Sequence, residues 1–144
     1  MNISLGSDHA GYQLKDKIIK LLEDRGIKTK DFGTNGDASV DYPDFAHPVA
    51  NDVTNGMADL GIVICGSGNG INMTVNKHKG IRSALCWNEE LASLSRQHNN
   101  ANVLALPARF ISEELGLKIV EAFLSAEFEG GRHQRRVDKI SEVG

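Results

Sequence analysis

The sequence predicts an α/β fold in which one five-stranded parallel sheet is covered by helices on both faces, a three-layer sandwich. Strand-like apolar runs alternate with stretches of helical apolar spacing five times along the chain. The most apolar run, residues 60–65, contains no charged or polar side chain, as expected of a strand buried on both faces. The 144 residues suffice for one domain, and no repeat or linker divides them.

The first part of the chain predicts a strand, a helix and a second strand. Residues 2–6 are a short apolar run, and Gly26 marks the end of the helix that follows. Residues 27–32 alternate apolar and polar side chains, which is typical of a strand near a sheet edge. Residues 33–41 form a polar, turn-rich loop. The first helix presents one apolar face, formed by Leu14, Ile18, Leu21 and Leu22.

The next helix is predicted around Phe45, Val49 and Val53, and Pro43 suits its first turn. Pro48 removes a backbone hydrogen bond, so this helix either begins late or is kinked. The remaining strands are predicted as buried runs at residues 60–65, 81–87 and 101–107.

The last long helix follows Ser112, which is a suitable N-cap with acidic residues directly after it. Its buried face is predicted to consist of Leu115, Ile119, Val120 and Phe123.

Composition and charge exclude several classes of protein. The net charge of −3 does not suggest a nucleic-acid-binding protein. The N-terminus lacks the pattern of a secretory signal, and no apolar run approaches the ~20 residues that span a membrane. Two cysteines, Cys65 and Cys86, do not make a disulfide framework. We therefore expect a reduced, cytoplasmic protein without nucleic-acid or membrane partners.

The glycine-rich stretch CGSGNG, residues 65–70, matches none of the common phosphate loops. The dinucleotide fingerprint fails because Ile71 stands where its third glycine should be, and the P-loop ending is absent. A hydrolase elbow centred on Ser67 lacks its flanking glycines. Alternating small residues before a helix still form a hollow of backbone N–H groups that favours an anion. Cys65 is thus either a base or nucleophile beside an oxyanion site, or a small buried hydrophobic residue.

Five stretches in order along the chain resemble the ribose-5-phosphate isomerase type B family, which includes galactose-6-phosphate isomerase subunits. They are SDHAG (7–11), DYPDFA (41–46), CGSGNGI (65–71), SRQHNNANVLALPAR (95–109) and EGGRHQRRVDKI (129–140). The resemblance implies a Rossmann-like fold and a metal-free aldose–ketose isomerase of the non-oxidative pentose phosphate pathway. It implies a homodimer, or a dimer of dimers, with active sites shared between subunits.

The resemblance assigns the proton transfer between C1 and C2 of the sugar to Cys65. In one branch of the family a glutamate after the glycine loop is the base, and Ile71 stands at that position here. The expected reaction converts D-ribose 5-phosphate to D-ribulose 5-phosphate through a cis-enediolate. Its oxyanion is expected to bind to the loop of Gly66, Gly68, Asn69 and Gly70.

Ring opening is assigned by resemblance to His98, whose imidazole suits an acid near neutral pH. Without the resemblance, a helix-end histidine bound to a backbone carbonyl is the better interpretation. Ser67 is expected to assist ring opening or relay a proton, although a simple turn serine competes for that role. Asn99 resembles a contact to a substrate hydroxyl or a part of the anion hole. In the family, the segment around His98 comes from the neighbouring subunit.

Substrate contacts are also expected after the first strand and in the polar loop. Asp8 resembles the residue that binds sugar hydroxyls, and His9 resembles a phosphate ligand. Helix capping by Ser7 or Asp8 is compatible with both roles. Tyr42 resembles a further substrate contact, and a buried tyrosine is a comparable alternative.

Residues 129–144 are expected to contribute to phosphate binding and subunit contacts within this single domain, residues 1–144. Arg132 and Arg136 lie four apart and share a helix face, which suits a phosphate dianion, whereas Arg135 points elsewhere. Arg109 is a third candidate. A solvated basic tail is the alternative to this interpretation.

No metal or other cofactor is expected. The histidines show no ligand spacing such as H-E-x-x-H, which argues against the metal-dependent sugar isomerases. They are His9, His47, His78, His98 and His133.

Three alternatives remain open. In the first alternative, the substrate is a six-carbon sugar phosphate such as allose 6-phosphate or galactose 6-phosphate, and the 33–41 loop and Trp87 set the length of the pocket. In the second alternative, Cys65 and His98 catalyse hydrolysis with the thiol as nucleophile, although the sequence contains no nucleophile-elbow motif that would support this. In the third alternative, the chain is a non-catalytic sugar-phosphate-binding protein, which would retain its function without Cys65.

Overall fold

A computed structural model describes residues 1–143, and its elements alternate as the sequence predicts. Five strands and six helices follow one another within this range. None of these helices is long and apolar enough to cross a lipid bilayer. The elements are β1 (Asn2–Ser7), α1 (Tyr12–Asp24), β2 (Lys28–Asp31), α2 (Tyr42–Thr54), β3 (Leu60–Cys65), α3 (Asn69–Asn76), β4 (Ser83–Leu85), α4 (Glu89–Gln97), β5 (Val103–Pro107), α5 (Glu113–Ser125) and α6 (Arg132–Ile140).

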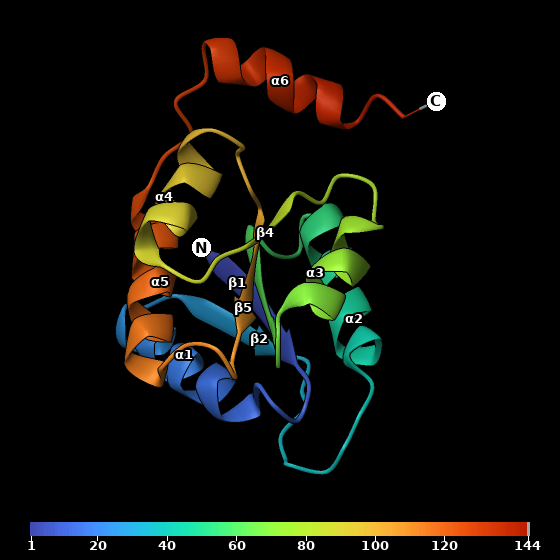
Figure 1. Ribbon diagram of the computed structural model, residues 1–144, viewed down its shortest axis with the longest axis vertical. Helices are drawn as coiled ribbons and strands as arrows, with labels where there is room; N and C mark the ends of the chain where they lie inside the picture. Colours follow the sequence, from blue (N-terminus) through green and yellow to red (C-terminus); the bar gives the residue numbers. More distant parts are fainter. Residues whose placement is uncertain (144) are drawn as a thin grey trace.

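The strands form one parallel sheet in the order β2-β1-β3-β5-β4. Helices α1, α4 and α5 cover one face, and α2 and α3 cover the other, so the predicted three-layer α/β architecture is confirmed (Figure 1). Strands β1 and β3 are neighbours, yet the helices that follow them lie on opposite faces. This is a topological switch point, where the carboxyl ends of the strands leave a crevice for a ligand.

Side chains alternate between two apolar cores across the central strand. Ile62 and Ile64 face the core beneath α1, α4 and α5, whereas Val63 and Cys65 face the core beneath α2 and α3. All six residues of β3 are buried, as predicted for a central strand.

The two edge strands differ in how well they were predicted. Strand β2 lies at the sheet edge, as its alternating pattern indicates. The run at 81–87 yields only β4, Ser83–Leu85, whose residues are partly exposed. It is shorter and less buried than predicted, because a strand at the other edge has only one neighbour.

The predicted helix boundaries are largely confirmed. The Ser112 side chain accepts a hydrogen bond from the Leu115 amide at 3.0 Å, and Gly26 follows α1 with φ of +74°. Helix α2 begins at Tyr42 and continues through Pro48, so it does not begin late.

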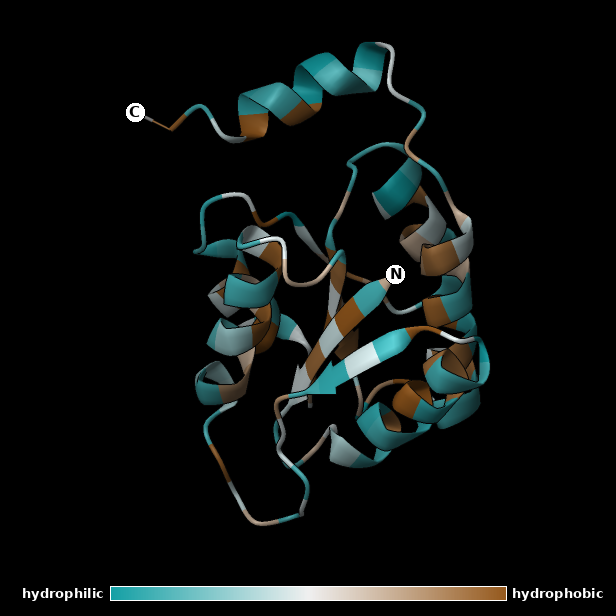
Figure 2. Ribbon diagram, turned by 180° about the vertical axis from the view of Figure 1, so that it is seen from behind, coloured by the Kyte–Doolittle hydropathy of each residue, from teal (hydrophilic) through white to brown (hydrophobic). Residues whose placement is uncertain are grey.

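Helix α6 lies beyond the amino ends of the strands, while the 33–41 loop lies at the opposite end of the molecule (Figure 1). Figure 2 shows α6 as mostly hydrophilic. Val137 is its only buried residue, and Ile140 is 54% exposed.

Candidate active site

Cys65 ends β3 at the switch point, with its side chain buried among Val63, Ile71 and the other residues of the α2–α3 core. Its carbonyl accepts a hydrogen bond from the Ala108 amide at 2.9 Å. Because a neighbouring strand end holds the backbone, the thiol has a defined place at the start of the glycine loop.

The glycine loop delivers the chain into α3. Gly68 has φ of +77°, and a Cβ built there would lie 2.4 Å from the Leu85 side chain. The Gly68 carbonyl accepts the first helical hydrogen bond, from Asn72 at 3.1 Å. Helix α3 therefore begins directly after the small residues of the loop, as the sequence predicts, and the amides of its first turn, which lack partners within the helix, favour an anion.

Ser67 makes the contact expected of a turn serine. Its Oγ accepts a hydrogen bond from the Asn69 amide at 3.2 Å, and the residue is exposed. A hydroxyl that accepts such a bond can still donate its own proton, so the local contact is compatible with a further role.

Tyr42 lies against the glycine loop from the first turn of α2. A Cβ built at Gly70 would lie 2.4 Å from the tyrosine Cζ and 2.6 Å from its hydroxyl oxygen. The side chain is 37% exposed, so it is not the buried tyrosine of the alternative interpretation. Its hydroxyl borders the loop beside Cys65.

Asp8 and His9 lie on the β1 side of the crevice. The Asp8 amide donates to the Ile64 carbonyl at 3.2 Å, which places Asp8 beside the end of β3. Its Oδ1 accepts a hydrogen bond from the Ala10 amide at 2.9 Å, as expected for a turn, and the residue is 7% exposed. His9 Nδ1 accepts a hydrogen bond from the Val40 amide at 3.2 Å. The neutral ring therefore carries its proton on Nε2, which is free to donate.

Arg109 joins this group after β5. Its amide donates to the Gly66 carbonyl at 3.0 Å, and its Nη1 would lie 3.3 Å from a Cβ at Gly66. The carboxyl ends of the strands, which we call the carboxyl edge of the sheet, thus bring together a thiol, the N-terminus of a helix and a cation.

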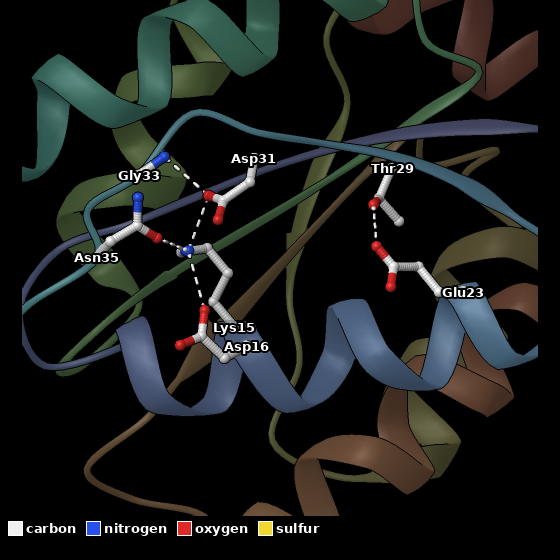
Figure 3. A network of polar contacts seen from close by, with 7 residues as sticks. All are labelled: Lys15, Asp16, Glu23, Thr29, Asp31, Gly33 and Asn35. Atoms are coloured by element: carbon white, nitrogen blue, oxygen red, sulfur yellow. Dashed lines mark hydrogen bonds and ion pairs between the residues drawn. The ribbon is translucent and has the colours of Figure 1, made fainter.

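A buried lysine that the sequence analysis missed supports the loop of this site (Figure 3). Lys15 is fully buried, and its Nζ contacts Asp31 Oδ1 at 2.8 Å and Asn35 Oδ1 at 3.1 Å. The same Asp31 oxygen accepts a hydrogen bond from the Gly33 amide at 2.8 Å. These contacts join α1 to the start of the 33–41 loop, which leads to Tyr42.

The remaining candidates lie beyond the amino ends of the strands, which we call the amino edge of the sheet. His98 and Asn99 follow α4, ahead of the amino end of β5, and Arg132 and Arg136 are exposed on α6. Strands of five or six residues separate them from the carboxyl edge by roughly 17–20 Å. One chain therefore does not bring these residues to its own Cys65.

The turn that carries Asn99 is held by an arginine that the sequence analysis missed. Arg82 Nε donates to the Asn99 and Asn100 carbonyls at 3.2 and 3.1 Å. Arg96 also reaches this turn through the Ala101 carbonyl. Burial and the nearby Arg82 lower the pKa of Arg96.

Two further groups with shifted pKa values, His78 and Cys86, lie outside the candidate site. His47 Nδ1 and His78 Nε2 are 2.6 Å apart. Burial and, to a smaller extent, the charge of His47 lower the pKa of His78. Burial raises the pKa of Cys86 to about 11, and a hydrogen bond with Ser95 opposes only part of this shift.

Comparison with known proteins places this geometry in a family. A family model described as Ribose/Galactose Isomerase matches residues 3–140. The ribose-5-phosphate isomerase B of Escherichia coli is 46% identical over 141 residues, which cover 98% of this chain and 95% of the relative. A probable ribose-5-phosphate isomerase B of Mycoplasma genitalium is 52% identical over 141 residues, with 96% and 93% covered.

Solved structures show the same fold. A ribose-5-phosphate isomerase B of Clostridium thermocellum superimposes with a TM-score of 0.97 at 54% identity, covering 99% of this chain and 96% of that one. The enzyme from Mycoplasma genitalium, solved with bound ribulose-5-phosphate, has a TM-score of 0.93 at 51% identity, covering 97% and 93%.

Proposed function

Because the chain belongs to the ribose/galactose isomerase family, we propose that it interconverts D-ribose 5-phosphate and D-ribulose 5-phosphate. One observation carries the proposal: Cys65 lies at the switch point of the sheet, at the start of a glycine loop that opens a helix. That arrangement supports the proposal, because an enediolate reaction requires a proton acceptor beside a site that binds a negatively charged oxygen.

Cys65 takes the proton from one sugar carbon and returns it to the neighbouring carbon. The enediolate oxygen binds the amides of the loop, Gly66 to Gly70. Asp8 accepts hydrogen bonds from the sugar hydroxyls, and the Tyr42 hydroxyl borders the same space. Ile71 is apolar and fully buried, so no glutamate at that position shares the work of the thiol.

The phosphate binds to cations and one imidazole. His9 donates from Nε2, because its Nδ1 accepts the Val40 amide. Arg109 lies next to the loop, and Arg132 with Arg136 provides two further guanidinium groups. Guanidinium groups bind phosphate oxygens bidentately, which fixes one end of the substrate.

The complete site is formed by two copies of the chain. Cys65 and Asp8 lie at one edge of the sheet, whereas His98, Asn99 and the α6 arginines lie at the other. In a homodimer, the α6 edge of one protomer meets the Cys65 edge of its partner, and His98 then protonates the ring oxygen. Exposed apolar side chains on the α6 segment support such a contact, since Ile140 and Val143 are 54% and 87% exposed.

The direct test is isotope exchange in EDTA-treated protein. Ribose 5-phosphate is incubated in deuterated water, and deuterium at C1 or C2 is measured by NMR. We expect wild-type protein and a Cys86→Ala control to isomerise and exchange, and Cys65→Ala to do neither. Undiminished isomerisation and deuterium exchange in the Cys65→Ala protein would refute the role of this thiol. Faster turnover of allose 6-phosphate would identify a six-carbon substrate.

A further inference from the structure

Three potential metal ligands meet where α6 joins the body. His98 follows α4, Glu129 precedes α6 and His133 lies in its first turn. Glu129 Oε1 is 3.8 Å from His98 Nε2 and 3.5 Å from His133 Nε2, and all three atoms lie within 4.8 Å of one another. The two imidazole rings are stacked, with centroids 4.3 Å apart and planes inclined by 11°.

The backbone holds the three residues in place. The Glu129 amide donates to the Gln97 carbonyl at 3.0 Å, so the segment before α6 is tied to the end of α4 beside His98. The His133 amide donates to the Gly130 carbonyl at 3.0 Å. The cluster therefore joins two parts of the chain that are about thirty residues apart.

The ligand set suits a transition metal. Two imidazole nitrogens and one carboxylate oxygen are a common zinc ligand set, and such sites leave a further position open. Metal–ligand bonds of about 2.1 Å place neighbouring ligand atoms roughly 3.4 Å apart in a tetrahedral shell. The observed separations from the carboxylate oxygen are close to this value. Magnesium and calcium prefer shells of oxygen atoms and are not expected here.

An ion pair alone explains the cluster less well. The carboxylate oxygen lies 3.8 Å and 3.5 Å from the two imidazole nitrogens, which is longer than an ordinary hydrogen bond. At these separations the two imidazole nitrogens and the carboxylate together offer lone pairs and a negative charge to a cation. In a single chain, the His98 and Glu129 side chains are 38% and 52% exposed.

We propose that His98, Glu129 and His133 form a binding site for Zn²⁺ or a similar divalent transition metal, and that the bound ion inhibits the enzyme. The inhibition rests on the proposed function, in which His98 is the acid for ring opening. An imidazole nitrogen that holds a metal ion cannot donate a proton. The ion is thus a reversible inhibitor, and the reaction does not need it.

Binding is tested without reference to activity. EDTA-treated protein is titrated with Co²⁺, followed by visible absorption, and with Zn²⁺ in a calorimeter. We expect about one ion per chain, and we expect Glu129→Gln and His133→Asn to weaken binding by at least about tenfold. The control His78→Asn alters the other histidine pair and should bind like wild type, as should Cys65→Ser. Circular dichroism checks that each variant is folded.

Inhibition is the second measurement. Rising Zn²⁺ should slow wild-type isomerisation, whereas Glu129→Gln and His133→Asn should require about tenfold more Zn²⁺ for the same fractional inhibition, each measured against the metal-free rate of that variant. Wild-type binding by both variants, or no binding by wild type, would overturn the site. Binding without inhibition would overturn the inhibitory role. If the protein does not isomerise sugar phosphates at all, the proposed function fails while the Co²⁺ titration still decides the site.

Discussion

At the carboxyl edge of the sheet, Cys65 and Asp8 are buried and their backbones bond to neighbouring strands. At the amino edge, Arg132 and Arg136 are exposed on a helix in which only Val137 is buried. The first group is positioned by the core of its own chain. The second group has no comparable support in one chain, which is why we assign it to the site of a partner.

Hybrid dimers give the largest expected effect. Cys65→Ala and His98→Ala should each lower activity by about 10²–10⁴-fold, the usual contribution of an acid or base. A heterodimer of the two variants contains one site with both defects and one intact site, so about half of the wild-type activity should return. The measurement is turnover by a purified heterodimer carrying two different tags.

The control for this experiment pairs two defects of the same edge. A heterodimer of Cys65→Ala with Asp8→Ala has one defect in each site, and we expect no recovery. Equal recovery in both hybrids would show that the two edges do not meet across subunits.

Lys15→Met should reveal how firmly the carboxyl edge is held. The change leaves Asp31 without its buried partner, and such losses cost about 3 kcal/mol of unfolding free energy. Lys17→Met is the control, since Lys17 pairs with Glu113 at the surface and should cost less than about 1 kcal/mol. Urea denaturation measures both. Similar losses would mean that the Lys15 contacts have no special weight.

The arginines of α6 should affect substrate binding more than chemistry. Arg132→Ala or Arg136→Ala should raise KM about 10- to 100-fold, because a hydrogen bond between charged groups contributes about 1.5–3 kcal/mol. Arg135→Ala changes the same charge on another helix face and should alter KM less than about twofold. An equal rise in all three variants would indicate only a general electrostatic effect.

The smallest effect concerns Cys86, which belongs to neither edge. Burial raises its pKa from 9.0 to about 11, so the unfolded chain ionises this thiol first. The buried neutral thiol makes its full contribution to the free energy of unfolding below pH 9, and this contribution disappears as the pH rises towards 11. Relative to Cys86→Ala, wild-type protein should therefore lose stability over that interval in urea denaturation. Parallel pH profiles would contradict this shift.

The sequence predicted the sheet, the order of the helices and the thiol beside the glycine loop. These features depend on apolar periodicity, glycine turns and helix caps, which are local properties of the sequence. The family resemblance implied that His98 comes from the neighbouring subunit. Residue patterns alone did not predict that His98 and Arg132 lie a strand length from Cys65, since that depends on which end of the sheet each connection reaches. Lys15 was missed although it stands on the apolar face of α1, between Leu14 and Ile18. The cluster of His98, Glu129 and His133 follows no spacing rule, because tertiary contacts bring its members together.

The placement of the two cysteines on opposite sides of the sheet also bears on oxidation. Cys65 packs beneath α2 and α3, and Cys86 packs beneath α1, α4 and α5. Peroxide that converts Cys65 to a sulfenic acid therefore meets no second thiol of the same chain that could form a disulfide. We expect recovery of activity after peroxide to require an added thiol such as glutathione, and spontaneous recovery would contradict this expectation. Without such a thiol, further oxidation to the sulfinic acid makes the loss permanent.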